Sequence, residues 1–197
     1  KTVYEPGFCG AELNQSGKLY PGWIVLAATF FCAMLIIGDT LYIYQLFVLP
    51  VTEEFDISRG EASSAYIAML AGIAVWSPFI GRLYDRVSAK WLVPIGGAAY
   101  AAGFTIIANS FSLPLMLLTI FLLLGLAMAA AGGLAANTIT TRWFERRRGR
   151  ALGIAAIASS AGGFFMVPVV TLLIESMNWR DALMVTGLVF GSIIALL

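Results

Sequence analysis

Six long apolar stretches divide the chain, and each is long enough to cross a membrane as a helix. About 20 helical residues span the roughly 30 Å hydrocarbon core of a bilayer. The stretches cover residues 22–49, 62–80, 91–108, 112–140, 151–174 and 182–197. Because a backbone in lipid must satisfy its own hydrogen bonds, we expect every stretch to be helical. The runs are continuous, which excludes the ten-residue alternation of a transmembrane β-barrel.

The composition strengthens this assignment. Of the 197 residues, 60% are hydrophobic and 12% are charged, about half of the roughly 25% charged residues found in soluble domains. A soluble protein of this length could not cover so much apolar surface, because much of a small chain faces water. The sequence therefore predicts an all-α integral membrane protein with the lipid bilayer as its main partner.

Basic residues are distributed unevenly among the short connections between the stretches. The second and fourth connections contain Arg82, Arg86, Lys90, Arg142, Arg146, Arg147, Arg148 and Arg150. The other three contain only Arg59 and Arg180. By the positive-inside rule, the two basic connections and the N-terminal tail, residues 1–21, lie in the cytoplasm. We expect residues 22–197 to form one transmembrane domain in the plasma membrane, the inner membrane of the cell.

The absence of certain residues and motifs excludes several kinds of chemistry. It has no histidine, and its two cysteines, Cys9 and Cys32, form no CxxC pair. His-dependent proteases, His-ligated metal sites and His proton relays are therefore excluded, and we expect no metal, no cofactor and no catalytic residue. There is no GxxxxGK[ST] loop for ATP hydrolysis. A net charge of +1 gives no indication of nucleic acid as a partner.

Residue types within the stretches also predict their surroundings. The fourth and fifth stretches are rich in Gly, Ala and Ser. Small side chains allow helix backbones to approach closely in a membrane, so we expect these two helices to pack tightly on their neighbours. Tryptophans stand at the ends of the stretches, the usual place of an interfacial aromatic belt: Trp23, Trp91, Trp143 and Trp179.

The second connection contains the most specific short motif. It reads Gly81-Arg82-Leu83-Tyr84-Asp85-Arg86-Val87-Ser88-Ala89-Lys90. A glycine here lets a helix end approach another backbone, and the acid can pair with an arginine or a helix N-terminus. The segment resembles the G-x-L-x-D-R-x-G-x-[RK] loop between helices two and three of the major facilitator superfamily, with Ser88 in place of the second glycine.

The resemblance implies a function for this loop. In the family, the cluster latches the cytoplasmic side between the two halves of a transporter. Gly81, Asp85, Arg86 and Lys90 are therefore candidates for a cytoplasmic gate. The alternative is a basic loop that serves only membrane topology.

The fourth connection carries a second resemblance. Its sequence, Arg142-Trp143-Phe144-Glu145-Arg146-Arg147-Arg148-Gly149-Arg150, is similar to the junction before helix five in the monocarboxylate transporter and oxalate/formate antiporter branch. For the arginines of this junction we favour topology and contact with anionic lipid, worth about 1 kcal/mol per basic residue. They lie at the cytoplasmic face, whereas secondary transporters bind substrate near the membrane midplane.

The resemblance covers the chain from residue 22 onward and implies its fold. It implies six transmembrane helices arranged as two inverted three-helix repeats, the N-terminal half of a twelve-helix transporter. Helices one and four then line the central cavity. The first residue is Lys and the last stretch is still apolar at its end, so we expect a truncated chain. Its partner is the C-terminal six-helix half or a second copy of itself.

Asp39 is the most informative single residue, because it is the only acid well inside an apolar stretch. A charge at that depth costs about 2.5–3.5 kcal/mol on insertion scales, so Asp39 should face a cavity or a partner. One reading is a carboxylate that takes up a proton or a coupling cation. The other is a structural acid that is bonded to a neighbouring helix and never exchanges protons.

Other polar residues extend this candidate site for substrate or coupling ion. On an α-helix, Tyr42 shares a face with Asp39 at position i+3, with Gln45 nearby and Asn137 on the fourth stretch. Monocarboxylate carriers usually have a lysine on helix one near this level, where this chain has Leu41.

The sequence therefore predicts secondary active transport of a small organic anion, such as a monocarboxylate, by alternating access with proton symport or anion exchange. A six-helix channel or a membrane receptor component is the alternative, and it would not need the Gly81–Lys90 pattern. An intramembrane enzyme is disfavoured, because histidine is absent and Asp39 has no acidic partner at membrane depth.

Overall fold

The computed structural model describes residues 21–144 and 148–196, and every regular element in these ranges is a helix. In chain order the elements are α1 (Pro21–Ile37), η1 (Gly38–Ile43), α2 (Tyr44–Phe55), α3 (Arg59–Arg86), α4 (Ala89–Ala108), α5 (Leu113–Thr119), η2 (Ile120–Leu124), α6 (Gly125–Ala131), α7 (Gly133–Trp143), α8 (Arg148–Ser176) and α9 (Trp179–Leu196). The segments η1 and η2 are π-helical. The tail over residues 1–20 lies outside the described residues.

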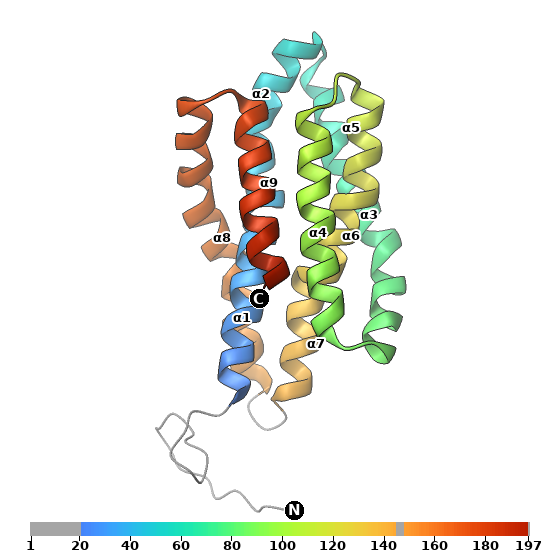
Figure 1. The fold of residues 1–197 in the computed structure, drawn as a ribbon, viewed down its shortest axis with the longest axis vertical. Helices are drawn as coiled ribbons and strands as arrows, with labels where there is room; N and C mark the ends of the chain where they lie inside the picture. Colours follow the sequence, from blue (N-terminus) through green and yellow to red (C-terminus); the bar gives the residue numbers. More distant parts are fainter. Residues whose placement is uncertain (1–20, 145–147, 197) are drawn as a thin grey trace, which may run out of the picture.

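These elements join into six spans that run side by side along the long axis of the molecule (Figure 1). Span 1 consists of α1, η1 and α2, and span 4 consists of α5, η2, α6 and α7. Spans 2, 3, 5 and 6 are the single helices α3, α4, α8 and α9. All six are long and apolar enough to cross a membrane, which confirms the six predicted stretches.

Two helix ends differ from the prediction, because polar residues continue the helices beyond the apolar runs. Span 1 passes through Pro50 and ends at Phe55, followed by Asp56 in the left-handed region (φ 50°). Residues 81–86, predicted as part of a loop, form the last turns of α3. At its other end α3 has a capping box, in which Ser58 and Glu61 satisfy each other's backbone N–H groups.

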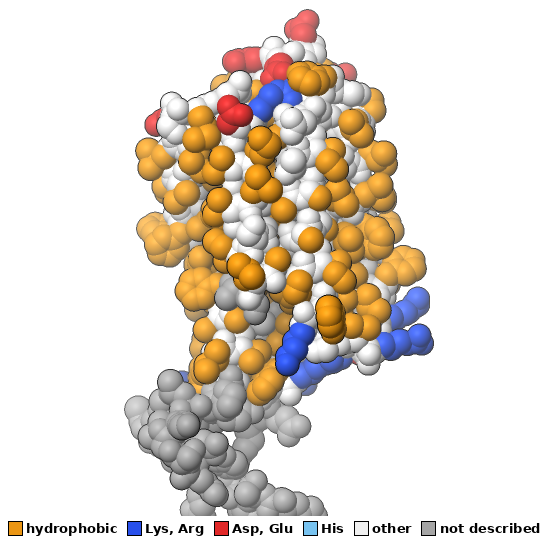
Figure 2. Space-filling model, in the orientation of Figure 1, with side chains coloured by type: hydrophobic (Ala, Val, Ile, Leu, Met, Phe, Trp, Pro, Cys, Tyr) orange, Lys and Arg blue, Asp and Glu red, His pale blue; other side chains and the backbone are white. Residues whose placement is uncertain are grey.

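Charges of opposite sign gather at the two ends of the bundle (Figure 2). At one end, called the basic end here, lie the exposed Arg82, Arg86, Lys90, Arg142, Arg148 and Arg150. At the other, the acidic end, lie Glu53, Glu54, Asp56, Glu61, Glu175 and Asp181. Between them the visible surface is predominantly apolar, as expected for helices that face lipid or other helices.

Two glycine contacts reveal the internal symmetry of the bundle. A Cβ atom added at Gly38 would lie 2.6 Å from the Cα atom of Gly162, so spans 1 and 5 meet backbone to backbone. A Cβ added at Gly125 would lie 2.7 Å from the Cα atom of Gly72, which brings spans 4 and 2 equally close. Gly38 begins η1 and Gly125 directly follows η2.

The two π-helical segments and their glycine contacts therefore occupy equivalent places in spans 1–3 and spans 4–6. Span 1 corresponds to span 4 and span 2 to span 5 if spans 1–3 and 4–6 are repeats. The contact between spans 1 and 5 then corresponds to the contact between spans 4 and 2. This is the arrangement of two inverted three-helix repeats, with spans 3 and 6 packed against each other. It also confirms the tight packing predicted from the small residues of the fourth and fifth stretches.

The backbone contact at Gly162 gives a stability prediction. Gly162→Val places two methyl groups where the backbone of Gly38 already lies, and overpacking typically costs about 1–3 kcal/mol. We expect a lower thermal unfolding midpoint or a loss of monodisperse protein in fluorescence-detected gel filtration. The matched control is Gly153→Val on the same helix, where an added Cβ meets nothing within 4 Å. Equal behaviour of the two variants would contradict the packing described here.

Candidate functional site

Asp39 lies in η1, near the middle of span 1, and is 1% exposed. Its Oδ2 atom accepts a hydrogen bond from the hydroxyl of Tyr100 on α4. Its Oδ1 atom is buried and has no hydrogen-bond partner among the described residues. The described part of the chain therefore satisfies only one of the two carboxyl oxygens, which is unusual for a buried acid.

Asp39 also lines a cavity of about 90 Å³ inside the bundle. Walls come from spans 1, 2, 3, 4 and 6, and they are mostly apolar, including Phe47, Met69, Phe104, Met116 and Trp179. We expected Asp39 to face a cavity or a partner. Its position agrees, since the residue lines this cavity and is hydrogen-bonded to Tyr100. Sequence reasoning missed Tyr100, because hydrophobic periodicity does not show which spans contact each other.

The other three residues of the candidate site do not join Asp39. Tyr42 is 44% exposed, and Gln45 and Asn137 are also exposed. The ring of Tyr42 packs beside Gly163 of α8, where an added Cβ would lie 3.0 Å from it. The prediction that Tyr42 shares a face with Asp39 is wrong. It assumed α-helical spacing, whereas this π-helical segment bonds from i to i+5 and so winds more residues into each turn.

Span 1 therefore presents two different polar sites. Asp39 points into the interior of the six-helix bundle, towards Tyr100. Tyr42 and Gln45 lie on an exposed side of the same span, and Asn137 is exposed on span 4. These are the two spans that the family resemblance places beside the central cavity.

An ion pair joins two of the predicted motif residues at the basic end. Asp85, at the end of α3, accepts a hydrogen bond from Arg142 of α7 at 3.2 Å. The pair joins the C-terminal ends of α3 and α7. It thereby links the two basic motifs of the second and fourth connections, which the sequence alone showed as separate. Arg86, Lys90 and Arg148 are exposed. Arg146 and Arg147 lie outside the described residues.

Gly81 differs from its expectation. An added Cβ would meet no atom within 4 Å, so no close backbone approach occurs at this glycine within residues 21–144 and 148–196.

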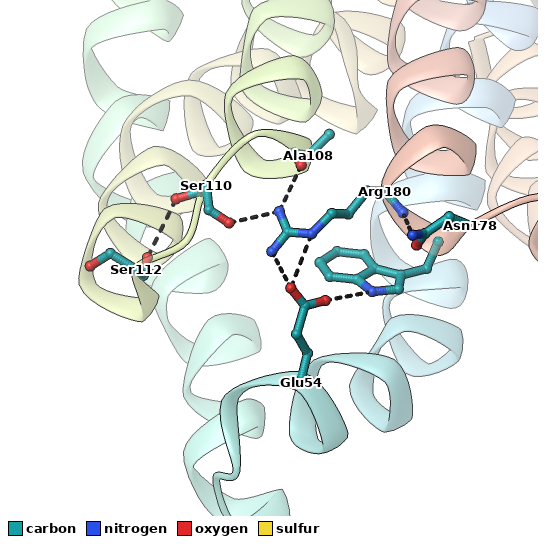
Figure 3. Close-up of polar contacts among 7 residues, drawn as sticks. Glu54, Ala108, Ser110, Ser112, Asn178 and Arg180 are labelled. Atoms are coloured by element: carbon teal, nitrogen blue, oxygen red, sulfur yellow. Dashed lines mark hydrogen bonds and ion pairs between the residues drawn. The ribbon is translucent and has the colours of Figure 1, made fainter.

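A second cluster, which sequence analysis missed, lies at the acidic end (Figure 3). The guanidinium of Arg180 donates to Glu54 at 2.6 Å and 3.2 Å, and to the carbonyl oxygens of Ala108 and Ser110 at 2.7 Å each. The indole of Trp179 donates to the other oxygen of Glu54 at 2.9 Å. The cluster fastens span 6 to the end of span 1 and to the connection after span 3.

The cluster corrects the assignment of Trp179 to an aromatic belt. The residue is only 9% exposed, in contrast to Trp91 at 70%. The available sequence signal was Arg180, one of two basic residues in the otherwise acidic connections. The guanidinium also lies 4.7 Å from the ring centre of Phe111, where a cation–π contact adds to the hydrogen bonds.

Comparisons with known proteins agree with this architecture. The sequence model of the Major Facilitator Superfamily matches residues 26–197. Human monocarboxylate transporter 11 is 33% identical over 169 residues, which cover 84% of this chain and 35% of that protein. The oxalate:formate antiporter of Oxalobacter formigenes is 27% identical over 186 residues, which cover 93% of this chain and 43% of the antiporter. The chain thus spans less than half the length of these relatives.

Proposed function

The chain belongs to the Major Facilitator Superfamily, and on that premise we propose that it forms one half of a secondary active transporter for small organic anions. The observation that carries the proposal is the match of almost the whole chain to monocarboxylate transporters and to an oxalate:formate antiporter. The inverted repeats support it, since alternating access in such folds moves one repeat-built bundle against another around a shared site.

In this proposal the exposed polar side of spans 1 and 4 faces the central cavity. Tyr42, Gln45 and Asn137 then contribute polar groups to the substrate site. The opposing wall comes from a C-terminal six-helix half or a second copy of this chain. The basic end lies in the cytoplasm in this proposal, because Lys and Arg concentrate on the cytoplasmic side of membrane proteins. The membrane that we propose is the plasma membrane.

Asp39 is the proposed coupling residue. Its buried carboxyl group, with one oxygen bonded to Tyr100 and the other unpartnered, suits a group that gains and loses a proton during the cycle. Its place inside the bundle, away from Tyr42, separates the proposed coupling site from the proposed substrate face. An organic anion bound at that face would then not touch the Asp39 carboxylate directly.

Uptake into liposomes tests the proposed substrate class. We expect liposomes that contain the purified full-length protein to take up labelled lactate, formate or oxalate. The uptake should be saturable and faster than that of empty liposomes. Unlabelled members of the same class should compete, and neutral sugars or amines of similar size should not. Uptake of none of these acids, or equal competition by the neutral compounds, would contradict the proposal.

The ion pair at the basic end predicts a functional defect without a stability defect. Asp85 and Arg142 side chains are 77% and 49% exposed, and exposed pairs contribute only about 0–1 kcal/mol. We expect Asp85→Asn to leave the unfolding midpoint nearly unchanged while uptake falls several-fold, because the pair holds two connections at the proposed gate.

The control exchanges the two charges. The double variant Asp85→Arg, Arg142→Asp restores an ion pair in which the two charges have changed places. It should recover part of the lost uptake. Normal uptake by Asp85→Asn would favour the alternative in which this segment serves only topology, as in a channel or receptor.

A further inference from the structure

Span 4 is interrupted at Gly132, between α6 and α7 (Figure 1). The ψ angle of Gly132 is −143°, whereas an α-helix has a ψ of about −42°. A Cβ atom added at Gly132 would overlap the carbonyl oxygen of Met128 in the preceding turn. The N–H of Gly132 donates to Met128 at 3.0 Å, and its carbonyl oxygen accepts from Ala136 at 3.0 Å. The break therefore depends on a glycine that is bonded to both helices.

The two sides of the break pack on different spans. Among the other spans, α6 contacts mainly α3 and α4, which are spans 2 and 3, whereas α7 contacts mainly α1 and α8, which are spans 1 and 5. Gly133, the first residue of α7, is loosely surrounded, since the nearest atom to an added Cβ is Cδ1 of Ile37 at 3.8 Å. A change of angle at Gly132 would therefore move α7 with spans 1 and 5 relative to spans 2 and 3.

The end of α3 holds both sides of the break through two adjacent residues. Tyr84 is 1% exposed, and its hydroxyl donates to the buried carbonyl oxygen of Ala130 in the last turn of α6. The last carbonyl groups of a helix have no partner within the helix, so Tyr84 satisfies a group at the break. Asp85 pairs with Arg142, near the end of α7, at 3.2 Å. One bond thus fixes the end of α6, and the other fixes the end of α7.

We propose that Gly132 is a hinge of the transport cycle and that Tyr84 is the positioning residue that holds this hinge at the angle described here. The proposal rests on the proposed function, in which the basic end opens and closes. The ion pair of Asp85 and Arg142 is exposed, and an exposed pair contributes little free energy. The buried hydroxyl of Tyr84 is therefore the contact that sets the angle of α7.

Tyr84→Phe isolates this contact, because it removes the hydroxyl and keeps the buried ring. One hydrogen bond of about 1 kcal/mol corresponds to a factor of about five in an equilibrium constant. We expect the population with a displaced α7 to rise by about that factor.

Distances between spin labels test the hinge without any transport assay. The full-length protein is placed in lipid nanodiscs with no substrate added. Labels on genetically encoded amino acids replace Thr141 of α7, which is half-buried, and Trp91 of α4, which is 70% exposed. Pulsed electron paramagnetic resonance then gives the distribution of distances between them. We expect Tyr84→Phe to move weight from the main distance of the wild-type protein to a second one.

Two neighbouring glycines provide a matched pair of variants. Gly132→Ala should displace the main distance and lower initial uptake several-fold, because its methyl group overlaps the carbonyl oxygen of Met128. Gly133→Ala is the control and should keep the wild-type distances and uptake, since its methyl group meets only an ordinary contact at 3.8 Å. Tyr84→Phe decides by itself if Gly132→Ala does not fold.

The same distance distribution in the wild-type protein and in Tyr84→Phe would overturn the proposal, as would equal behaviour of the two glycine variants. Failure of the hinge can be told apart from failure of the proposed function. A wild-type protein that takes up no organic acid contradicts the function, and the distances still decide the hinge. Unchanged distances together with normal wild-type uptake remove the hinge alone.

Discussion

Replacing Asp39 with asparagine is expected to flatten the pH dependence of uptake by the full-length protein and to lower its rate by about tenfold or more. Asparagine has nearly the same shape as aspartate and can still accept a hydrogen bond from Tyr100, but it cannot carry a proton. A tenfold loss corresponds to only about 1.4 kcal/mol of barrier, a modest effect for the loss of a coupling group. The measurement is initial uptake by proteoliposomes between about pH 5 and 8.

Tyr100→Phe provides the comparison for this experiment. It leaves the carboxyl group in place and removes the one hydrogen-bond donor that this group has among the described residues. The pH profile should therefore move along the pH axis while keeping its amplitude. Normal uptake with an unchanged pH profile in Asp39→Asn would assign Asp39 to a structural role and remove it from coupling.

The second large effect is expected at the acidic end. Arg180→Ala removes four hydrogen bonds that join spans 1 and 6 to the connection after span 3. The Arg180 side chain is 14% exposed and that of Glu54 is 37% exposed. Breaking a fully buried pair costs about 3–5 kcal/mol, and the partial exposure of Glu54 reduces our expectation to about 2–3 kcal/mol. The loss should appear as a lower unfolding midpoint.

Arg59→Ala is the control for this prediction. Arg59 is the other basic residue of the acidic end, and its side chain is exposed. Its removal should change stability by less than about 0.5 kcal/mol, as is usual for surface positions. A similar loss in both variants would mean that net charge at this end, and not the contacts of Arg180, determines stability.

The sequence predicted the spans well because the signal for them is local. Each apolar run must form a helix in lipid, whatever its neighbours are. Helix ends were less accurate, since polar residues such as those at 81–86 continue a helix wherever they can stay hydrated. The tight contacts of Gly125 and Gly162 were anticipated as a class, because small side chains gather on closely packed helices.

The candidate site was harder to predict, because it depends on which residues meet across spans. The bond between Asp39 and Tyr100 joins positions 61 residues apart, and the bond between Glu54 and Arg180 joins positions 126 apart. No local sequence pattern indicates that the two residues of either pair come into contact. The error at Tyr42 has a different cause, since a π-helical segment interrupts the α-helical spacing on which the prediction relied.

Counterflow distinguishes an alternating-access carrier, of which we propose that this chain forms half, from a channel. Liposomes containing the full-length protein are loaded with an unlabelled acid such as formate or oxalate, and entry of the labelled acid is measured. We expect internal acid to accelerate entry and to drive transient accumulation of label above equilibrium. In a carrier, the binding site returns to the outer side faster when internal acid is bound to it. A channel has no such step. If label enters at the same rate with or without internal acid and never exceeds equilibrium, the protein is not an alternating-access carrier of these acids.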